Sequence, residues 1–247
     1  MSPVAVEMRT DDAVAVLTVD GELDDAHSTA LRERILLAAL DDAAAVIVNV
    51  SGLKVHTPSA WSAFVGAYWQ IGSVGHIPIV LACTNRAVRE AITSSGLTHF
   101  MPVYSSEKAA FKALGQNSRR PVRRFEVQLP ADLTSLRESR RLVREWLTIW
   151  SRPKLIPVAL VVVNVFVENV LEHTHSVPAV RIEVQGTTAT VAVSDASTAP
   201  AVRLPSPKQG IDVAGLAIVD ALSRAWGSTP ISSGKTVWAV IGPENQL

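Results

Sequence analysis

The residues best placed to do chemistry lie in one stretch, LIPVALVVVNVFVENVLEHTHS, from Leu155 to Ser176. It begins almost purely apolar and then takes on amide, carboxylate and imidazole side chains three to four residues apart. On a helix, this spacing places several of them on one face. A polar stripe on a buried helix must meet a partner or a ligand. The polar set is Asn164, Glu168, Asn169, Glu172 and His173.

The remaining residues of this stretch predict the element that positions the stripe. Valines and leucines would cover most of the remaining circumference of a helix, which predicts a buried helix. The alternative is a core helix whose polar end simply reaches solvent. A membrane span is not expected, because Pro157 and Asn164 interrupt the apolar run before it reaches roughly 18 residues.

The stretch resembles the first nucleotide-binding helix of the histidine-kinase-like ATPases, in the form found in anti-sigma-factor serine kinases. The resemblance implies that Asn169 helps to hold Mg²⁺ and that His173 takes the position of the family histidine. The family glutamate, the base toward the attacking hydroxyl, aligns with Val165. Valine cannot take a proton, so phosphoryl transfer lacks its base.

Three later motifs extend this resemblance over about Phe125 to Ile241. Asp195 takes the position that accepts a hydrogen bond from the adenine amine, and Gly215 belongs to a glycine box at a helix N-terminus near the phosphates. Taken alone, Asp195 could be a turn or cap residue and Gly215 a packing contact. The resemblance implies a site for ATP or ADP with Mg²⁺, formed by Asn169, His173, Asp195, Gly215, Leu216, Lys235 and Thr236.

The composition is typical of a globular protein of one or two domains, with 247 residues, 48% hydrophobic, 19% charged and a formal net charge of zero. This balance favours neither nucleic acid nor a membrane surface as a partner. Cys83 is the only cysteine, which excludes an intrachain disulfide and leaves His173 and His175 without further zinc ligands. The first residues show no signal-peptide pattern, so we expect a cytoplasmic protein.

Residues 1–116 alternate strand and helix patterns, which predicts an α/β domain with a mostly parallel or mixed sheet. Asn85 is a candidate N-cap. The expected strands are 4–9, 13–19, 44–50, 78–82 and 101–104, and the expected helices are 26–40, 59–71, 85–93 and 105–114.

This half resembles the STAS domain of anti-sigma-factor antagonists. Three passages in the family order carry the resemblance: Gly21–Asp24 at a strand-to-helix turn, Val48–Gly52 on the central strand, and Asn85–Leu97 on the third helix and its exit. The resemblance implies a domain that binds an anti-sigma partner.

The regulatory serine of that family lies in a turn before the second helix. Here Pro58 takes the position of this phosphoacceptor and Thr57 that of the preceding aspartate. Proline has no hydroxyl, so the usual switch cannot operate at this position. Thr57 and Ser59 are neighbouring hydroxyls that could accept phosphate, although either could instead be an N-cap.

Aromatic residues follow on the second helix. Trp61, Tyr68 and Trp69 either face the sheet or present a surface to a partner. In the family this helix and the preceding turn form the docking face. The resemblance therefore implies a partner-binding surface that comprises Thr57, Ser59, Trp61, Tyr68 and Trp69.

Residues 117–124 are polar, basic and interrupted by proline, which predicts a linker. Residues 125–247 are expected to form an α+β domain, which by resemblance is a Bergerat-type ATPase sandwich with a mixed sheet covered by helices. The expected strands are 125–129, 178–184, 189–194 and 236–241, and the expected helices are 132–150, 155–176 and 212–226, with a turn at 229–233.

These patterns give one main hypothesis and two alternatives. The main one is a partner-switching regulator that binds a sigma factor, an anti-sigma factor or an antagonist, with nucleotide bound by the second domain. The family resemblance also implies a homodimer as an option, and neither nucleic acid nor membrane is an expected partner. The alternatives are an active protein serine kinase whose base is another residue, such as Glu168, and a catalytically dead interaction scaffold.

Overall fold

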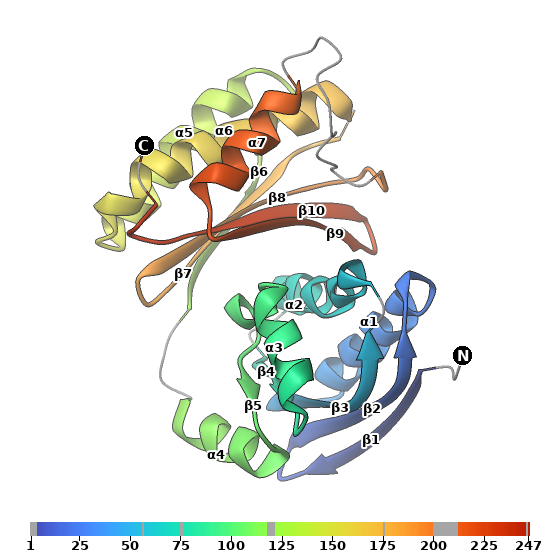
Figure 1. Ribbon diagram of the computed structural model, residues 1–247. Coiled ribbons are helices and arrows are strands. Elements are labelled where there is room, and N and C mark those ends of the chain that lie inside the picture. The colour runs from blue at the N-terminus through green and yellow to red at the C-terminus, as the bar shows by residue number, and fades with distance from the viewer. Residues whose placement is uncertain are drawn as a thin grey trace. The chain divides into compact units, whose positions relative to one another are not determined.

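The computed structural model describes residues 4–55, 57–74, 77–117, 122–174, 176–199, 212–245 and 247. The chain divides into two compact units, Met1–Arg119 and Arg120–Leu247 (Figure 1). Each unit has a five-stranded sheet of its own.

Unit 1 is built on a sheet with the strand order β1-β2-β3-β4-β5. Strands β1 and β2 pair antiparallel, and the other neighbours pair parallel. This confirms the expected mixed, mostly parallel sheet with helices. The elements are β1 (Ala5–Asp11), β2 (Val14–Leu23), α1 (Asp25–Leu40), β3 (Ala45–Val55), η1 (Pro58–Trp61), α2 (Ser62–Val74), β4 (Ile79–Ala82), α3 (Arg86–Ser94), η2 (Leu97–His99), β5 (Val103–Tyr104) and α4 (Glu107–Asn117).

Local capping explains where two of these helices begin. The carboxylate of Asp24 accepts a hydrogen bond from the N–H of His27 at 2.9 Å, just before α1. The side chain of Asn85 accepts from the N–H of Ala87 at 3.0 Å, which confirms Asn85 as the N-cap of α3. Each side-chain oxygen satisfies an N–H group that has no partner within its helix.

Unit 2 has the strand order β6-β7-β8-β10-β9, with helices on one face of the sheet (Figure 1). All its neighbouring strands pair antiparallel, so the expectation of a mixed sheet was wrong for this unit. Hairpins join β7 to β8 and β9 to β10, which fixes these pairs as antiparallel. The elements are β6 (Arg123–Gln128), α5 (Thr134–Ile149), η3 (Pro153–Leu155), α6 (Ile156–His173), β7 (Ala179–Gln185), β8 (Thr188–Asp195), α7 (Asp212–Leu222), β9 (Ala225–Ile231) and β10 (Gly234–Ile241).

Helix α6 is the central core element of unit 2, as the apolar pattern predicts. Its side chains pack against inward-facing residues of the sheet. By length and composition alone, Pro153–His173 passes as a membrane span, contrary to the expectation from its interrupting residues. Its burial is that of a core helix. The buried residues of α6 are Val158, Ala159, Val162, Val163, Val165, Phe166, Val167 and Val170.

Two boundaries of unit 2 differ from expectation. Strand β6 begins at Arg123, inside the expected linker, and β9 occupies residues expected to end a helix and form a turn. Pro230 made β9 difficult to predict, because proline argues against a strand except at the edge of a sheet. Strand β9 is such an edge strand. Gly227 lies under the ring of Trp238, where an added Cβ would come within 2.8 Å of a ring carbon.

The packing of α6 predicts a large effect of truncating Phe166, which is 1% exposed. Phe166→Ala should lower the free energy of unfolding by about 3–5 kcal/mol, because it leaves a cavity between helix and sheet. Urea denaturation monitored by circular dichroism measures this change. The control Glu172→Ala, at an exposed position of the same helix, should stay within about 0.5 kcal/mol. An equally small change for Phe166→Ala would contradict this packing.

Candidate functional site

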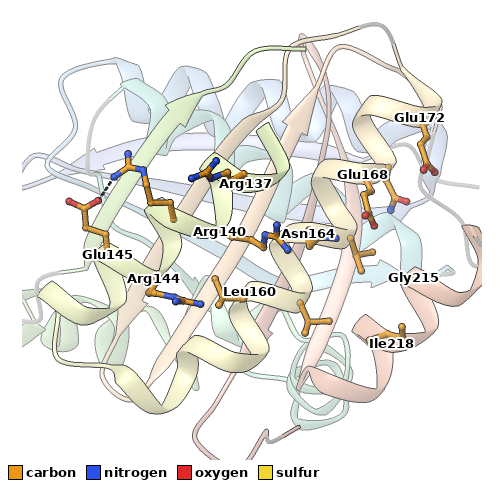
Figure 2. Close-up of a pocket in the computed structure, with 14 residues that line it drawn as sticks. Arg137, Arg140, Arg144, Glu145, Leu160, Asn164, Glu168, Glu172, Gly215 and Ile218 are labelled. Carbon is orange, nitrogen blue, oxygen red and sulfur yellow. Dashed lines mark hydrogen bonds and ion pairs between the residues drawn. The ribbon is translucent and has the colours of Figure 1, made fainter. Parts of the chain in front are cut away.

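The polar stripe of α6 faces a groove of about 1010 Å³ on the helical side of unit 2 (Figure 2). Of the expected nucleotide ligands, Asn169 and Gly215 line it, and Val165 lines it at the base position. The lining also includes arginines of α5 that the sequence analysis had not selected. The residues are Arg137, Arg140, Arg141, Arg144, Glu145, Leu160, Val161, Asn164, Val165, Glu168, Asn169, Glu172, Gly215 and Ile218.

Asp195, the expected adenine acceptor, is instead held by the protein itself. Its side chain is 1% exposed, and one carboxylate oxygen, Oδ1, accepts a hydrogen bond from Lys235 Nζ at 3.0 Å. The same oxygen accepts from the N–H of Ser197 at 2.7 Å. Lys235, expected to be a nucleotide ligand, thus neutralises this carboxylate from the neighbouring strand β10. One oxygen of the carboxylate that the resemblance assigns to adenine is therefore bound within the protein.

Thr236 does not join Asp195 in one site. Thr236 lies opposite Ser194 in the β8–β10 register, and their hydroxyls are 2.8 Å apart. Successive side chains of a strand point to opposite faces of the sheet, so Thr236 and Ser194 lie on the other face from Lys235 and Asp195. Lys235 and Thr236, both expected to bind the nucleotide, therefore lie on opposite faces of the sheet.

Gly215 and Val165 are in contact, which supports the packing interpretation of this glycine. A Cβ added to Gly215 would lie 3.0 Å from Cγ1 of Val165, tighter than an ordinary contact. Helix α7 therefore approaches α6 closely at the position where the family places its base. The neighbouring Leu216 is 7% exposed and belongs to the hydrophobic core.

The remaining expected ligands do not complete a nucleotide site. His173 is exposed in the last turn of α6, and His175 lies outside the described residues. Among the described residues, no three His, Cys, Asp or Glu side chains gather as a metal site. Asn169 and Gly215 line the groove, whereas Asp195 is paired with Lys235 and Val165 is packed against Gly215. Binding of ATP with Mg²⁺ stays a prediction.

In unit 1, the hydroxyl of Thr57 donates to the carboxylate of Asp25 at 3.4 Å, at the start of α1. A phosphate on Thr57 would lie beside this negative charge and be repelled by it. The side chains of Pro58 and Ser59 lie outside the described part of the structure.

The aromatic residues of η1 and α2 form ring contacts within unit 1. The rings of Trp69 and Phe100 are 5.5 Å apart, edge to face, and Tyr68 lies 5.3 Å from the same phenylalanine ring. Trp61 lies 5.5 Å from Phe64. These contacts hold the rings in an aromatic cluster. A role of Trp61, Tyr68 and Trp69 in binding a partner stays a prediction.

The comparisons with known proteins assign unit 1. Residues 5–110 match the family model described as the STAS domain. The N-terminal unit is thus a STAS domain, as the sequence motifs indicate. No curated protein is similar enough to the chain to be matched.

Several solved structures are similar to part of the chain. An anti-sigma factor antagonist from Mycobacterium paratuberculosis shares 21% identity, with a TM-score of 0.41 over 45% of this chain and 94% of the other. An anti-sigma-factor antagonist (STAS) domain protein from Planctomyces limnophilus shares 18% identity, with a TM-score of 0.38 over 46% and 98%. The antagonist SpoIIAA in its unphosphorylated form shares 22% identity, with a TM-score of 0.37 over 45% and 97%.

The Asp195–Lys235 pair predicts a stability effect. Lys235→Met should lower the free energy of unfolding by about 3–5 kcal/mol, because it leaves a buried carboxylate without its cation. Urea denaturation at pH 7 measures the loss. Lys154→Met removes the same charge at an exposed position and should change stability by less than about 0.5 kcal/mol. If the two variants were equally stable, the pair would have no structural role.

Proposed function

We propose that this chain is a cytoplasmic regulator that acts by binding proteins of a sigma-factor control circuit, without transferring phosphoryl groups. The observation that carries the proposal is the STAS domain at residues 5–110, whose turn before α2 has Pro58 at the phosphoacceptor position. The proposed partners are a sigma factor, an anti-sigma factor or an antagonist. Binding through unit 1 would then not be switched by phosphorylation at position 58, because proline cannot accept a phosphate.

In the second unit, the position that the resemblance assigns to the catalytic base is occupied by Val165, which supports this proposal. We propose that it descends from the anti-sigma-factor serine kinases, on the strength of its motifs and of helices packed on one face of a sheet. Transfer of a phosphoryl group to a hydroxyl needs a base near the attacking oxygen. Val165 offers none, and it packs against Gly215, where an added Cβ would lie 3.0 Å from its Cγ1. We infer that this unit, too, works by binding.

Nucleotide binding by the second unit is the second candidate function. One observation favours it, namely that Asn169 and Gly215 line the same groove. The side chain of Asp195, however, is 1% exposed, and its Oδ1 already accepts from Lys235. Adenine would have to share this buried carboxylate with the lysine. We therefore rank this candidate below binding without nucleotide.

A phosphoryl-transfer assay tests the main proposal. The full chain is incubated with labelled ATP and Mg²⁺, with its own Pro58→Ser variant as the acceptor. We expect no label on either protein, because the base position is Val165. Val165→Glu is the matched variant that restores the carboxylate. Transfer of label by the natural chain would contradict the proposal and favour an active kinase that uses another base, such as Glu168.

A further inference from the structure

Helix α5 presents a row of arginines to the groove of unit 2. Arg137, Arg140 and Arg144 line it and follow one another at helical spacing, spanning about 10 Å along the axis. In Figure 2, Arg140 and Arg144 extend from α5 toward Asn164 and Leu160 of α6. Three guanidinium groups on one wall create a strip of positive potential.

The arginines of this row differ from the neighbouring Arg141 in their ion pairs. Arg141 is satisfied within its own helix, donating to Glu138 at 2.6 Å and to Glu145 at 2.8 Å. Arg137 and Arg144, by contrast, form no ion pair with any residue in the described ranges, and Nε of Arg140 donates to a backbone carbonyl of its own helix. Arginine forks prefer carboxylates or phosphates. Many of the N–H donors of these three guanidinium groups are therefore available to a ligand.

The other surfaces of the groove limit what this ligand can be. Its floor is apolar, with Leu160 and Val161 on α6, and Ile218 on α7 is a large hydrophobic side chain left 44% exposed. Glu168 and Glu172 stand at the C-terminal end of α6 and repel anions. A ligand must therefore place its negative charges against α5 alone and an apolar side on the floor.

We propose that this groove binds a helical segment of a partner protein whose apolar stripe is bordered on one side by acidic residues. The inference rests on the proposed function, because it assumes that the second unit binds proteins. A row about 10 Å long matches acidic residues spaced over two helical turns, whereas one phosphate would engage only part of it and leave the apolar floor uncovered. Amphipathic helices bind grooves in this way, through apolar anchors spaced along one face.

A synthetic peptide tests this directly. The probe is a fluorescein-labelled helix of roughly 16 residues made of Ala, Leu and Glu, with Leu on one face and Glu along one edge of it. Fluorescence anisotropy measures its binding to the full chain. We expect saturable binding that weakens at least tenfold in Arg137→Glu/Arg140→Glu/Arg144→Glu and weakens as salt rises. The same peptide with Lys in place of Glu should bind at least tenfold more weakly.

Matched controls keep the test interpretable. Lys108→Glu/Lys112→Glu reverses exposed charges on α4 and should leave binding unchanged. Arg144→Gln, a milder change, should weaken binding at least twofold with an unchanged melting temperature, which separates lost contact from lost folding. Absence of saturable binding at 100-fold excess of protein over peptide, or equal binding by the triple variant, would overturn the proposal.

Binding of an inorganic polyphosphate distinguishes a phosphate site from a helix-binding groove. If sodium tripolyphosphate bound to the groove while the Glu peptide did not, the site would recognise phosphate and the helix proposal would fail. Failure of the peptide also differs from failure of the proposed function, which the phosphoryl-transfer assay reports independently.

Discussion

The structure of unit 2 depends on the burial of one apolar helix. Eight residues of α6 are buried in the core of the unit, and burying each large side chain contributes about 1.5–3 kcal/mol. This packing fixes the rotation of the helix about its axis. Its polar residues are thereby held on the outer side, where they form the groove with α5 and α7. The groove is thus a consequence of how the core is filled.

The same packing involves the two positions at which the resemblance to a kinase places a base and an adenine acceptor. Val165 belongs to the core and touches Gly215, so the position that a kinase keeps for a base here joins two helices. Likewise, the Asp195 carboxylate, which the resemblance assigns to adenine, accepts a hydrogen bond from Lys235 on the adjacent strand.

The sequence was informative wherever local patterns decide structure. The apolar run of α6, the β7–β8 hairpin and the Asn85 cap are all set by neighbouring residues, and these expectations were confirmed. Strand β9 was missed because its sequence contains Gly227 and Pro230. Proline fits there because β9 is an edge strand, and glycine fits because the ring of Trp238 lies against it, and both depend on the tertiary structure. The partner of Asp195 lies 40 residues away, so no local pattern could reveal it. The spacing of Arg137, Arg140 and Arg144 can be read from the sequence. That these arginines line a groove depends on α6 and α7, which supply the rest of the lining.

We propose that the second unit does not bind nucleotide, because Lys235 pairs with Asp195 and Val165 packs against Gly215. The most direct measurement is the melting temperature of the full chain with and without millimolar ATP and Mg²⁺. A ligand at about 100 times its dissociation constant adds roughly 2.7 kcal/mol, which would appear as a shift of several degrees. Our account predicts no shift. A shift of several degrees that disappears in Asn169→Ala would contradict it and establish a working nucleotide site.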